Sequence, residues 1–308
     1  MAPTTDFSGK VLFQAPPAGE FDASTLAGKS VIITGATTGL GEAFMRSYVQ
    51  HGAFVTFAAR SVEKGEALVS ELGADKVAFV RTDVLKWADQ VHLFKTALEK
   101  SPSKTIDIVI ANAGVAGHDV LADDKLTEDG DPAEPNLAIL HVDLLGAVYT
   151  AKLALHYLAR QPEGRDRCLI LTSSIAGYLE KPGSPQYNAA KFGVRGLFRS
   201  LRTTMPKDGM RVNLVAPWFI PAAINPPEMY KHLLDVGVGL ADAKDAAAAV
   251  MQLSADTTLN GRAVCIIPRS WGGPGYVDLQ QDDHPPEDPM SGWQDLIWKM
   301  EPSSRVAT

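Results

Sequence analysis

The chain has 308 residues, of which 45% are hydrophobic and 21% charged, with a formal net charge of −7 at pH 7. This composition is typical of a soluble globular protein, and the negative charge argues against a nucleic-acid-binding surface. The first 21 residues lack a basic stretch followed by an apolar run. No apolar stretch approaches the ~20 residues of a membrane span. We therefore expect a cytoplasmic protein with no nucleic-acid or membrane partner.

Short runs rich in β-branched residues alternate with amphipathic stretches along the chain. We expect strands at 31–35, 54–59, 77–82, 106–111, 168–173, 211–216 and 262–267. We expect helices at 39–51, 62–72, 87–99, 136–160, 185–206 and 242–255. This alternation predicts an α/β fold, a Rossmann-type doubly wound parallel sheet of about seven strands with helices on both faces, in a single domain.

The ends of the chain extend beyond this pattern. We expect residues 28–268 to form the domain, with an irregular, proline- and glycine-containing lid at about 218–240. Residues 1–27 and 269–308 would be N- and C-terminal extensions. Near the C-terminus, an apolar stripe follows helical spacing through Trp293, Leu296, Ile297 and Met300. That stripe would pack on its own domain, on a partner subunit or over the active site. The two cysteines, Cys168 and Cys265, lie in expected strands and should be reduced core residues.

A glycine-rich turn joins the first expected strand to the first expected helix. The sequence TGATTGLG places Gly35, Gly39 and Gly41 at this junction. Glycine permits a tight turn and lets a pyrophosphate approach the backbone amides of a helix N-terminus, where the helix dipole favours anions. Glycines also occur in ordinary strand–helix turns. The motif indicates a cofactor site here because it lies between a strand and a helix near the start of the chain.

A serine, a tyrosine and a lysine form a second motif further along the chain. Tyr187 follows Ser174 by thirteen positions, and Lys191 follows Tyr187 by four. On a helix, the tyrosine and the lysine therefore share one face. A neighbouring ammonium lowers the pKa of a phenol, and a serine hydroxyl can donate to the oxygen that the phenol protonates. These residue types predict a proton-transfer site beside a carbonyl or an alcohol.

Together, these motifs resemble those of the short-chain dehydrogenase/reductase family over roughly residues 28–268. Within the single-domain branch of that family, the sequence looks most like fungal proteins of the 15-hydroxyprostaglandin-dehydrogenase type. The resemblance implies catalytic roles for Ser174, Tyr187, Lys191 and Asp143. It also implies a homodimer or homotetramer, and no metal. The cofactor contacts that it implies are Gly35, Thr38, Gly39, Leu40, Gly41, Arg60, Asp83, Val84, Asn112, Ala113, Gly114, Tyr187, Lys191, Pro217 and Ile220.

The choice of cofactor depends on the end of the second expected strand. Dehydrogenases that use NAD usually carry an acidic residue there, which binds the ribose hydroxyls. This chain has Ala59 followed by Arg60. An arginine can pair with a 2′-phosphate, so NADP(H) is favoured and NAD(H) is the alternative. A surface arginine that merely opens the next helix is the competing interpretation of Arg60. Thr38 stands where many NADPH-dependent members carry a basic residue.

Three positions depart from the family pattern. One is Ala222, which stands where a threonine often bonds the nicotinamide amide. Asp143 stands where the family usually has an asparagine, and its charge would act on Lys191. Trp218 follows Pro217 where the family usually has a glycine. We expect Trp218, with Phe219 and Tyr178, to line a substrate pocket for a flat or apolar molecule; packing beneath the lid is the alternative for Trp218.

The sequence therefore predicts an NADPH-preferring oxidoreductase that interconverts a ketone and a secondary alcohol. Its small-molecule substrate would be bulky and apolar, like a steroid, prostanoid, polyketide or terpenoid. Two alternatives stay open. One is an NAD-dependent secondary-alcohol dehydrogenase on the same fold, and the other is a cofactor-binding protein without redox activity.

Overall fold

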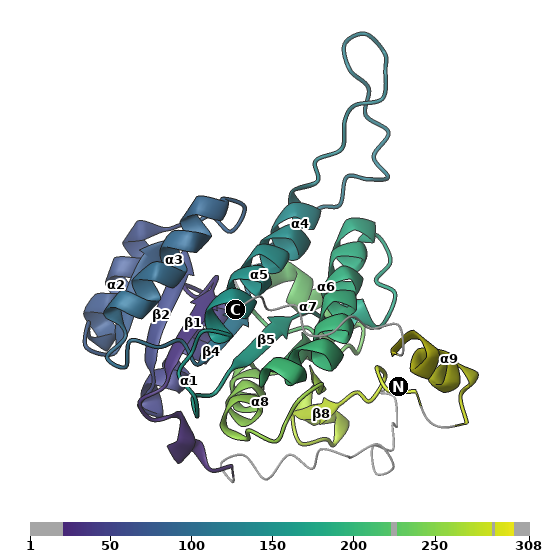
Figure 1. Cartoon of the computed structure of the whole chain (residues 1–308). Helices are drawn as coiled ribbons and strands as arrows, with labels where there is room; N and C mark the ends of the chain where they lie inside the picture. Colours follow the sequence, from purple (N-terminus) through teal and green to yellow (C-terminus); the bar gives the residue numbers. More distant parts are fainter. Residues whose placement is uncertain (1–20, 223–226, 285–286, 299–308) are drawn as a thin grey trace.

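The computed structural model describes residues 21–222, 227–284 and 287–298, and its centre is one eight-stranded sheet (Figure 1). The strand order is β3-β2-β1-β4-β5-β6-β7-β8, and only β8 runs antiparallel to its neighbour. The strands are β1 Ser30–Thr34, β2 Phe54–Ala59, β3 Val77–Arg81, β4 Ile108–Ala111, β5 Cys168–Thr172, β6 Arg211–Pro217, β7 Ala263–Ile266 and β8 Tyr276–Asp278. The order reverses between β1 and β4, which opens a crevice at their carboxyl ends.

Helices cover both faces of the sheet, because its strands are apolar on both sides. Val31 and Ile33 of β1 point into one core cluster, whereas Ile32 between them points into the other. The first cluster is closed by α1 Gly39–Gln50, α2 Val62–Leu72 and α8 Ala243–Ala255. The second is closed by α3 Trp87–Lys100, α5 Gly146–Leu158 and α6 Pro185–Thr204. This arrangement confirms the predicted doubly wound fold.

Two elements lie where the sequence indicated irregular chain. The short strand β8 belongs to the segment expected to be a C-terminal extension, and it pairs with β7 through Cys265 and Val277. Helix α7, Pro227–Asp235, lies within the expected lid. Residues 223–226 of that lid, and residues 1–20 of the N-terminal extension, lie outside the described part of the chain. The sheet therefore extends beyond the seven expected strands.

The helix before β5 lies within the predicted range 136–160, but it is more apolar than we expected from the sequence. α4 Ala138–Leu140, the π-helical turn η2 His141–Leu145 and α5 form 21 continuous helical residues with mean hydropathy 1.4. By length and composition alone, this stretch could span a membrane, so the expectation that no such stretch exists was wrong. Leu153 and Leu158 on this helix are buried in the second core cluster, against the sheet. The loop before it, around 116–136, projects away from the body (Figure 1).

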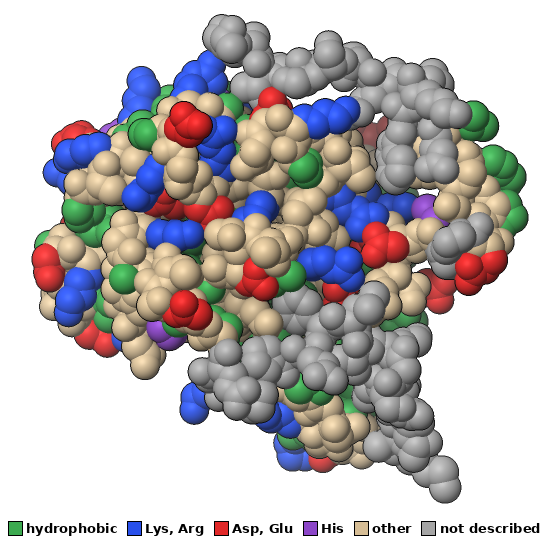
Figure 2. All heavy atoms as spheres, turned by 60° about the horizontal axis from the view of Figure 1, so that its bottom comes forward, with side chains coloured by type: hydrophobic (Ala, Val, Ile, Leu, Met, Phe, Trp, Pro, Cys, Tyr) green, Lys and Arg blue, Asp and Glu red, His purple; other side chains and the backbone are tan. Residues whose placement is uncertain are grey.

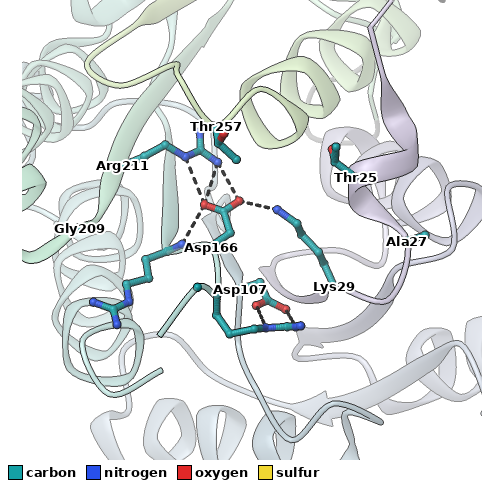
Figure 3. A pocket seen from close by; sticks show the side chains of 11 residues that line it. Thr25, Ala27, Lys29, Asp107, Asp166, Gly209, Arg211 and Thr257 are labelled. Atoms are coloured by element: carbon teal, nitrogen blue, oxygen red, sulfur yellow. Dashed lines mark hydrogen bonds and ion pairs between the residues drawn. The ribbon is translucent and has the colours of Figure 1, made fainter. Parts of the chain in front are cut away.

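The opposite, amino-terminal edge of the sheet is held by ion pairs (Figure 3). Asp166, just before β5, binds Lys29 before β1 at 2.7 Å and Arg211 of β6 at 2.9 Å. The guanidinium of Arg165 forms an ion pair with the carboxylate of Asp107, which lies just before β4. Although burial opposes it, Arg211 and Lys29 lower the pKa of Asp166. On this side of the molecule, acidic and basic side chains are interspersed (Figure 2). These pairs tie the starts of four strands together, away from the crevice.

Both cysteines are buried in strands, Cys168 in β5 and Cys265 in β7. Burial raises the pKa of Cys168 to about 11 and that of Cys265 to about 12, so both thiols stay protonated at neutral pH. Their predicted location in the core is confirmed.

The C-terminal helix α9, Pro289–Trp298, leaves its apolar stripe exposed. The exposed fractions are 62% for Trp293, 58% for Leu296 and 59% for Ile297. Met300 lies outside the described residues. Within this single chain, the three described residues of the stripe are therefore not buried against their own domain.

Candidate active site

One cavity of about 1000 Å³ lies at the carboxyl ends of the parallel strands. Its volume is at the upper end of the range for ligand sites, roughly 300–1,000 Å³, which leaves room for a cofactor together with a substrate. All but one of the site residues expected from the sequence line it. These are Gly35, Thr38, Gly39, Leu40, Gly41, Arg60, Asp83, Val84, Asn112, Ala113, Gly114, Asp143, Ser174, Tyr187, Lys191, Pro217, Trp218, Phe219 and Ile220. The exception is Tyr178.

The glycine turn is shaped by close backbone packing between β1 and β4. Gly35 has φ of +70°, and a Cβ there would come within 2.7 Å of the Cα of Ala113. Asn112 reinforces this approach, because its side-chain amide donates to the carbonyls of Thr34 at 3.0 Å and Gly35 at 3.2 Å. Gly39 then begins α1 with φ of +61°. The amides of the first turn of α1 are thereby left lining the cavity, which is a geometry that suits a pyrophosphate.

Ser174 and the first turns of α6 meet beyond the carboxyl end of β5, which is separated from β1 by β4. Ser174 follows β5 and caps the 3₁₀ turn η3, Ile175–Gly177, where its Oγ accepts from the Ala176 amide at 3.2 Å. Ser173 fixes this turn to α6 by donating to the carbonyl of Lys191 at 2.9 Å. The Lys191 ammonium lies 5.4 Å from the ring centroid of Tyr187, on the same helix. The predicted serine, tyrosine and lysine are thus brought together at one place in the cavity.

Asp143 lies directly behind Lys191, on the π-helical turn η2. Its Oδ2 is 3.0 Å from Lys191 Nζ, and both side chains are almost fully buried. The short distance makes this an ion pair, although the approach to Oδ2 is not that of a directed hydrogen bond. The other oxygen, Oδ1, accepts from the Val115 amide at 2.7 Å. Burial disfavours the charged lysine, but the Asp143 carboxylate more than offsets this and raises the pKa of Lys191.

At the other end of the cavity, two exposed cations follow β2. Arg60 lies immediately after β2, and Lys64 lies in the first turn of α2, which Ser61 caps. Both line the cavity, and neither forms an ion pair with a described residue. The second strand ends without a carboxylate. This end of the cavity therefore presents two positive charges that the ion pairs of the described residues leave unpaired.

The segment after β6 supplies an aromatic wall. The indole of Trp218 donates to the Gly239 carbonyl at 2.9 Å, and its ring packs edge-on against Phe219 and Trp271. Trp218 therefore combines both roles considered from the sequence, since it lines the cavity and also holds the lid segment near Gly239. Tyr230 and Leu233 of α7 add to the wall.

Tyr178 is the exception among the expected pocket residues. Its hydroxyl donates to Asp282 at 2.6 Å, and the guanidinium of Arg195 lies 3.9 Å above its ring. The side chain thus faces the C-terminal segment and α6 rather than the cavity. Its neighbour Leu179 lines the cavity instead. The prediction that Tyr178 lines the substrate pocket was wrong, because a buried carboxylate distant in sequence binds its hydroxyl.

Among the cavity-lining residues that sequence reasoning missed are Lys64, Lys181 and Tyr230. Lys64 had a readable signal, because it follows Arg60 by four positions and so shares a face of the helix that begins there. Lys181 lies between Ser174 and Tyr187, close in sequence to two predicted catalytic residues. Tyr230 had no such signal, since the lid was not expected to contain a helix.

Comparison with known proteins identifies the family to which this chain belongs. A family model described as short chain dehydrogenase matches residues 29–230. The chain is similar to the 5′-hydroxyaverantin dehydrogenases of Dothistroma septosporum and Emericella nidulans, each 36% identical over 282 residues, which is 85% of this chain and 90% of theirs. It is also similar to the NADP-dependent dehydrogenase M3 of Phoma sp., 30% identical over 85% of this chain and 81% of that protein.

A solved structure agrees at the level of fold. The crystal structure of a short-chain type dehydrogenase/reductase from Mycobacterium marinum matches with a TM-score of 0.69, covering 81% of this chain and 98% of that one at 22% identity. The family match over most of the chain and the relatives of similar length lead to one conclusion. This chain belongs to the short-chain dehydrogenase/reductase family and is an NAD(P)-dependent oxidoreductase.

Proposed function

We propose that this protein is an NADPH-preferring oxidoreductase that interconverts a ketone and a secondary alcohol on a bulky, largely apolar substrate. The observation that carries this proposal is the convergence of Ser174, Tyr187 and Lys191 with the glycine turn in one cavity. A dinucleotide fits the residues present, because the close packing at Gly35 leaves the amides of α1 free for a pyrophosphate. The cavity volume of about 1000 Å³ also leaves room for a substrate.

When bound, the nicotinamide supplies or accepts the hydride at the substrate carbon. The chain's own residues manage the proton. In reduction, the O–H bond of Tyr187 breaks and its proton goes to the substrate oxygen. The buried Lys191 ammonium stabilises the phenolate that remains. Oxidation reverses this transfer, and the phenolate takes the proton of the alcohol.

Ser174 would orient the substrate oxygen. The acceptor for its hydroxyl in the described structure is the Pro217 carbonyl, at 3.5 Å, which is the limit for a hydrogen bond. A substrate oxygen at normal distance would therefore replace it readily. Asp143 acts through Lys191 and does not touch the substrate, so it is a positioning residue.

The preference for NADPH rests on Arg60 and Lys64. Two cations without carboxylate partners at the end of β2 would pair with a 2′-phosphate by charge-assisted hydrogen bonds. The name of the Phoma relative, NADP-dependent dehydrogenase M3, is consistent with this assignment. The apolar substrate class rests on the wall formed by Trp218, Phe219, Ile220 and Leu233. The names of the two 5′-hydroxyaverantin dehydrogenases agree with a fungal secondary-metabolic alcohol or ketone.

The direct test follows the absorbance of NADPH and NADH at 340 nm with a panel of bulky ketones. We expect Tyr187→Phe to lower turnover about 10²- to 10⁴-fold while the affinity for NADPH is kept. We expect Arg60→Ala with Lys64→Ala to raise the KM for NADPH and leave that for NADH unchanged. Lys100→Ala, an exposed lysine at the end of α3, is the control.

Two results would favour the alternatives. Better turnover with NADH than with NADPH would mean that Arg60 is a surface residue and that the protein is an NAD-dependent dehydrogenase. Tight binding of both cofactors without turnover of any ketone or alcohol would favour a cofactor-binding protein without redox activity.

A further inference from the structure

Lys181 is a second lysine beside Tyr187, and the mechanism does not use it. It lies in the loop between β5 and α6, lines the cavity and is half-buried. Its ammonium is 5.0 Å from the ring centroid of Tyr187, which is closer than the 5.4 Å of Lys191. Lys191 has the carboxylate of Asp143, whereas the ion pairs formed within 21–222, 227–284 and 287–298 leave Lys181 without one.

The backbone at Lys181 is held in place by α6. Asn188, one residue after Tyr187, accepts from the Lys181 amide at 3.2 Å. Its side-chain amide donates to the carbonyls of Ala176 and Leu179, both at 3.0 Å. One asparagine on the catalytic helix thus fixes both ends of the segment that carries Lys181. This anchor limits how far the Lys181 stem can reach, and the ammonium lies beside the Tyr187 ring.

Two carboxylates are near Lys181, those of Glu180 and Asp119, and neither forms an ion pair with it among the described residues. Glu180 lines the same cavity but is exposed to solvent. Burial lowers the pKa of Lys181, and the field of Asp119 acts in the opposite direction. The Asp119 carboxylate is already occupied, because it accepts from the backbone amide of Gln186 at 2.6 Å, from its side-chain amide at 3.1 Å and from the Leu121 amide at 3.2 Å. A partly desolvated ammonium gains most from an anion that enters the cavity.

The position of Lys181 separates it from the phosphate-binding part of the site. The glycine turn follows β1, and Lys181 belongs to the loop that follows β5. Since β4 lies between these strands, the two segments start about 10 Å apart. Arg60 and Lys64 lie still further away, after β2. The Lys181 ammonium lies beside the Tyr187 ring, so it borders the region where the oxygen of the proposed substrate would lie.

We propose that Lys181 binds an anionic oxygen group of the substrate, a carboxylate or an ionised phenol, close to the oxygen that Tyr187 protonates. This assignment rests on the proposed function for the chemistry at Tyr187, and it narrows the substrate class. The substrate has an apolar body, which fits the wall at Trp218 and Leu233, and one acidic group near the reacting carbon.

Equilibrium binding to the full chain saturated with NADP⁺ tests this assignment without requiring turnover. The probes are 4-acetyl-2-naphthoate, its neutral carboxamide and 4-acetyl-2-naphthol, in which the acidic group and the acetyl ketone lie meta to each other on one ring. Binding is followed by quenching of tryptophan fluorescence. The variants are Lys181→Met, which keeps the length of the stem, and Lys181→Arg, which keeps the charge. Lys95→Met, an exposed lysine on α3, is the control.

We expect the wild type to bind the naphthoate about 10- to 100-fold more tightly than the carboxamide, as a charge-assisted hydrogen bond predicts. Lys181→Met should abolish this ratio, and Lys181→Arg should keep most of it. The affinity for NADPH should be unchanged in all variants. For the naphthol, a Lys181-dependent gain in affinity between pH 7 and 9 would identify phenolate binding, and a gain confined to the naphthoate would identify a carboxylate.

Equal affinities for charged and neutral probes, no measurable binding of either acidic probe, or a loss of NADPH affinity in Lys181→Met would each overturn the assignment. Failure of the proposed function looks different. In that case the Lys181-dependent ratio is present, but wild-type protein reduces none of the three ketones with NADPH.

Discussion

Replacing Asp143 with asparagine removes the counter-charge of Lys191 with little change in shape. The asparagine Oδ1 can still accept from the Val115 amide, so the local backbone should be kept. Two unit charges 3.0 Å apart attract by about 5 kcal/mol at an effective dielectric constant of about 20. Breaking a buried ion pair from one side costs about 3–5 kcal/mol. We therefore expect Asp143→Asn to lower the free energy of unfolding by about 3–5 kcal/mol at pH 7.

The pH dependence of this loss has a definite sign. In the wild type the pKa of Lys191 is raised, so the contribution of the pair is fully present below the unfolded value of about 10.4 and disappears only above it. Without Asp143, burial dominates and the pKa of Lys191 falls below the unfolded value. The unfolded variant then binds more protons than the folded one, and the stability of the variant rises with pH. The difference from the wild type should shrink between pH 7 and 10.

Urea unfolding of both proteins at pH 7, 8, 9 and 10 measures this difference, and titrations common to both cancel. Asp235→Asn, which removes the exposed partner of Lys231, is the control and should change stability by less than about 1 kcal/mol. The alkaline limb of the pH–activity profile should move to lower pH in Asp143→Asn, because Lys191 loses its proton earlier. A stability difference that is absent, or that stays constant from pH 7 to 10, would refute this reasoning.

Two further substitutions test how the site is held. Gly35→Ala should abolish binding of either cofactor and destabilise the fold more than the control, Gly164→Ala. Both glycines have positive φ, but only at Gly35 would the new Cβ meet another part of the backbone. Calorimetry measures the stability of the two variants, and titration with NADPH measures their cofactor affinity. Asp282→Asn should lower the free energy of unfolding by about 3 kcal/mol, because Arg195 and the Tyr178 hydroxyl lose a buried partner. The control, Asp283→Asn, changes a half-exposed carboxylate and should have little effect when both variants are unfolded in urea.

Much of this fold is readable from local sequence because its strands are buried on both faces. Runs such as Val31–Ile33 have no polar side to confuse the pattern, and each is followed by an amphipathic helix. Strand β8 escaped notice because it has only three residues and lies at the sheet edge, where pairing with β7 rather than intrinsic preference defines it. Helix α7 escaped because it begins at Pro227, within a stretch of prolines that is typical of irregular loops.

The site was predictable wherever spacing along one element decides the geometry. Tyr187 and Lys191 face the same way because they are four residues apart on α6. The glycine turn lies at the cavity because the carboxyl end of β1 is there. Lys181 was harder to find, because the direction of a loop side chain depends on which partner anchors the loop. Here that partner is Asn188, whose three hydrogen bonds to the loop have no sequence signature.

Tyr178 shows the same limit from the other side of this loop. A tyrosine in a loop beside the substrate can turn its hydroxyl either inward or outward, and the choice here was made by Asp282, 104 residues further along the chain. Asp282 also binds Arg195 of α6, so the C-terminal segment holds the loop and the catalytic helix together. Because Lys181 follows Tyr178 by only three positions, this contact should also help to aim Lys181 into the cavity. If Asp282→Asn releases Tyr178, it should therefore weaken the preference for acidic probes more than the affinity for NADPH.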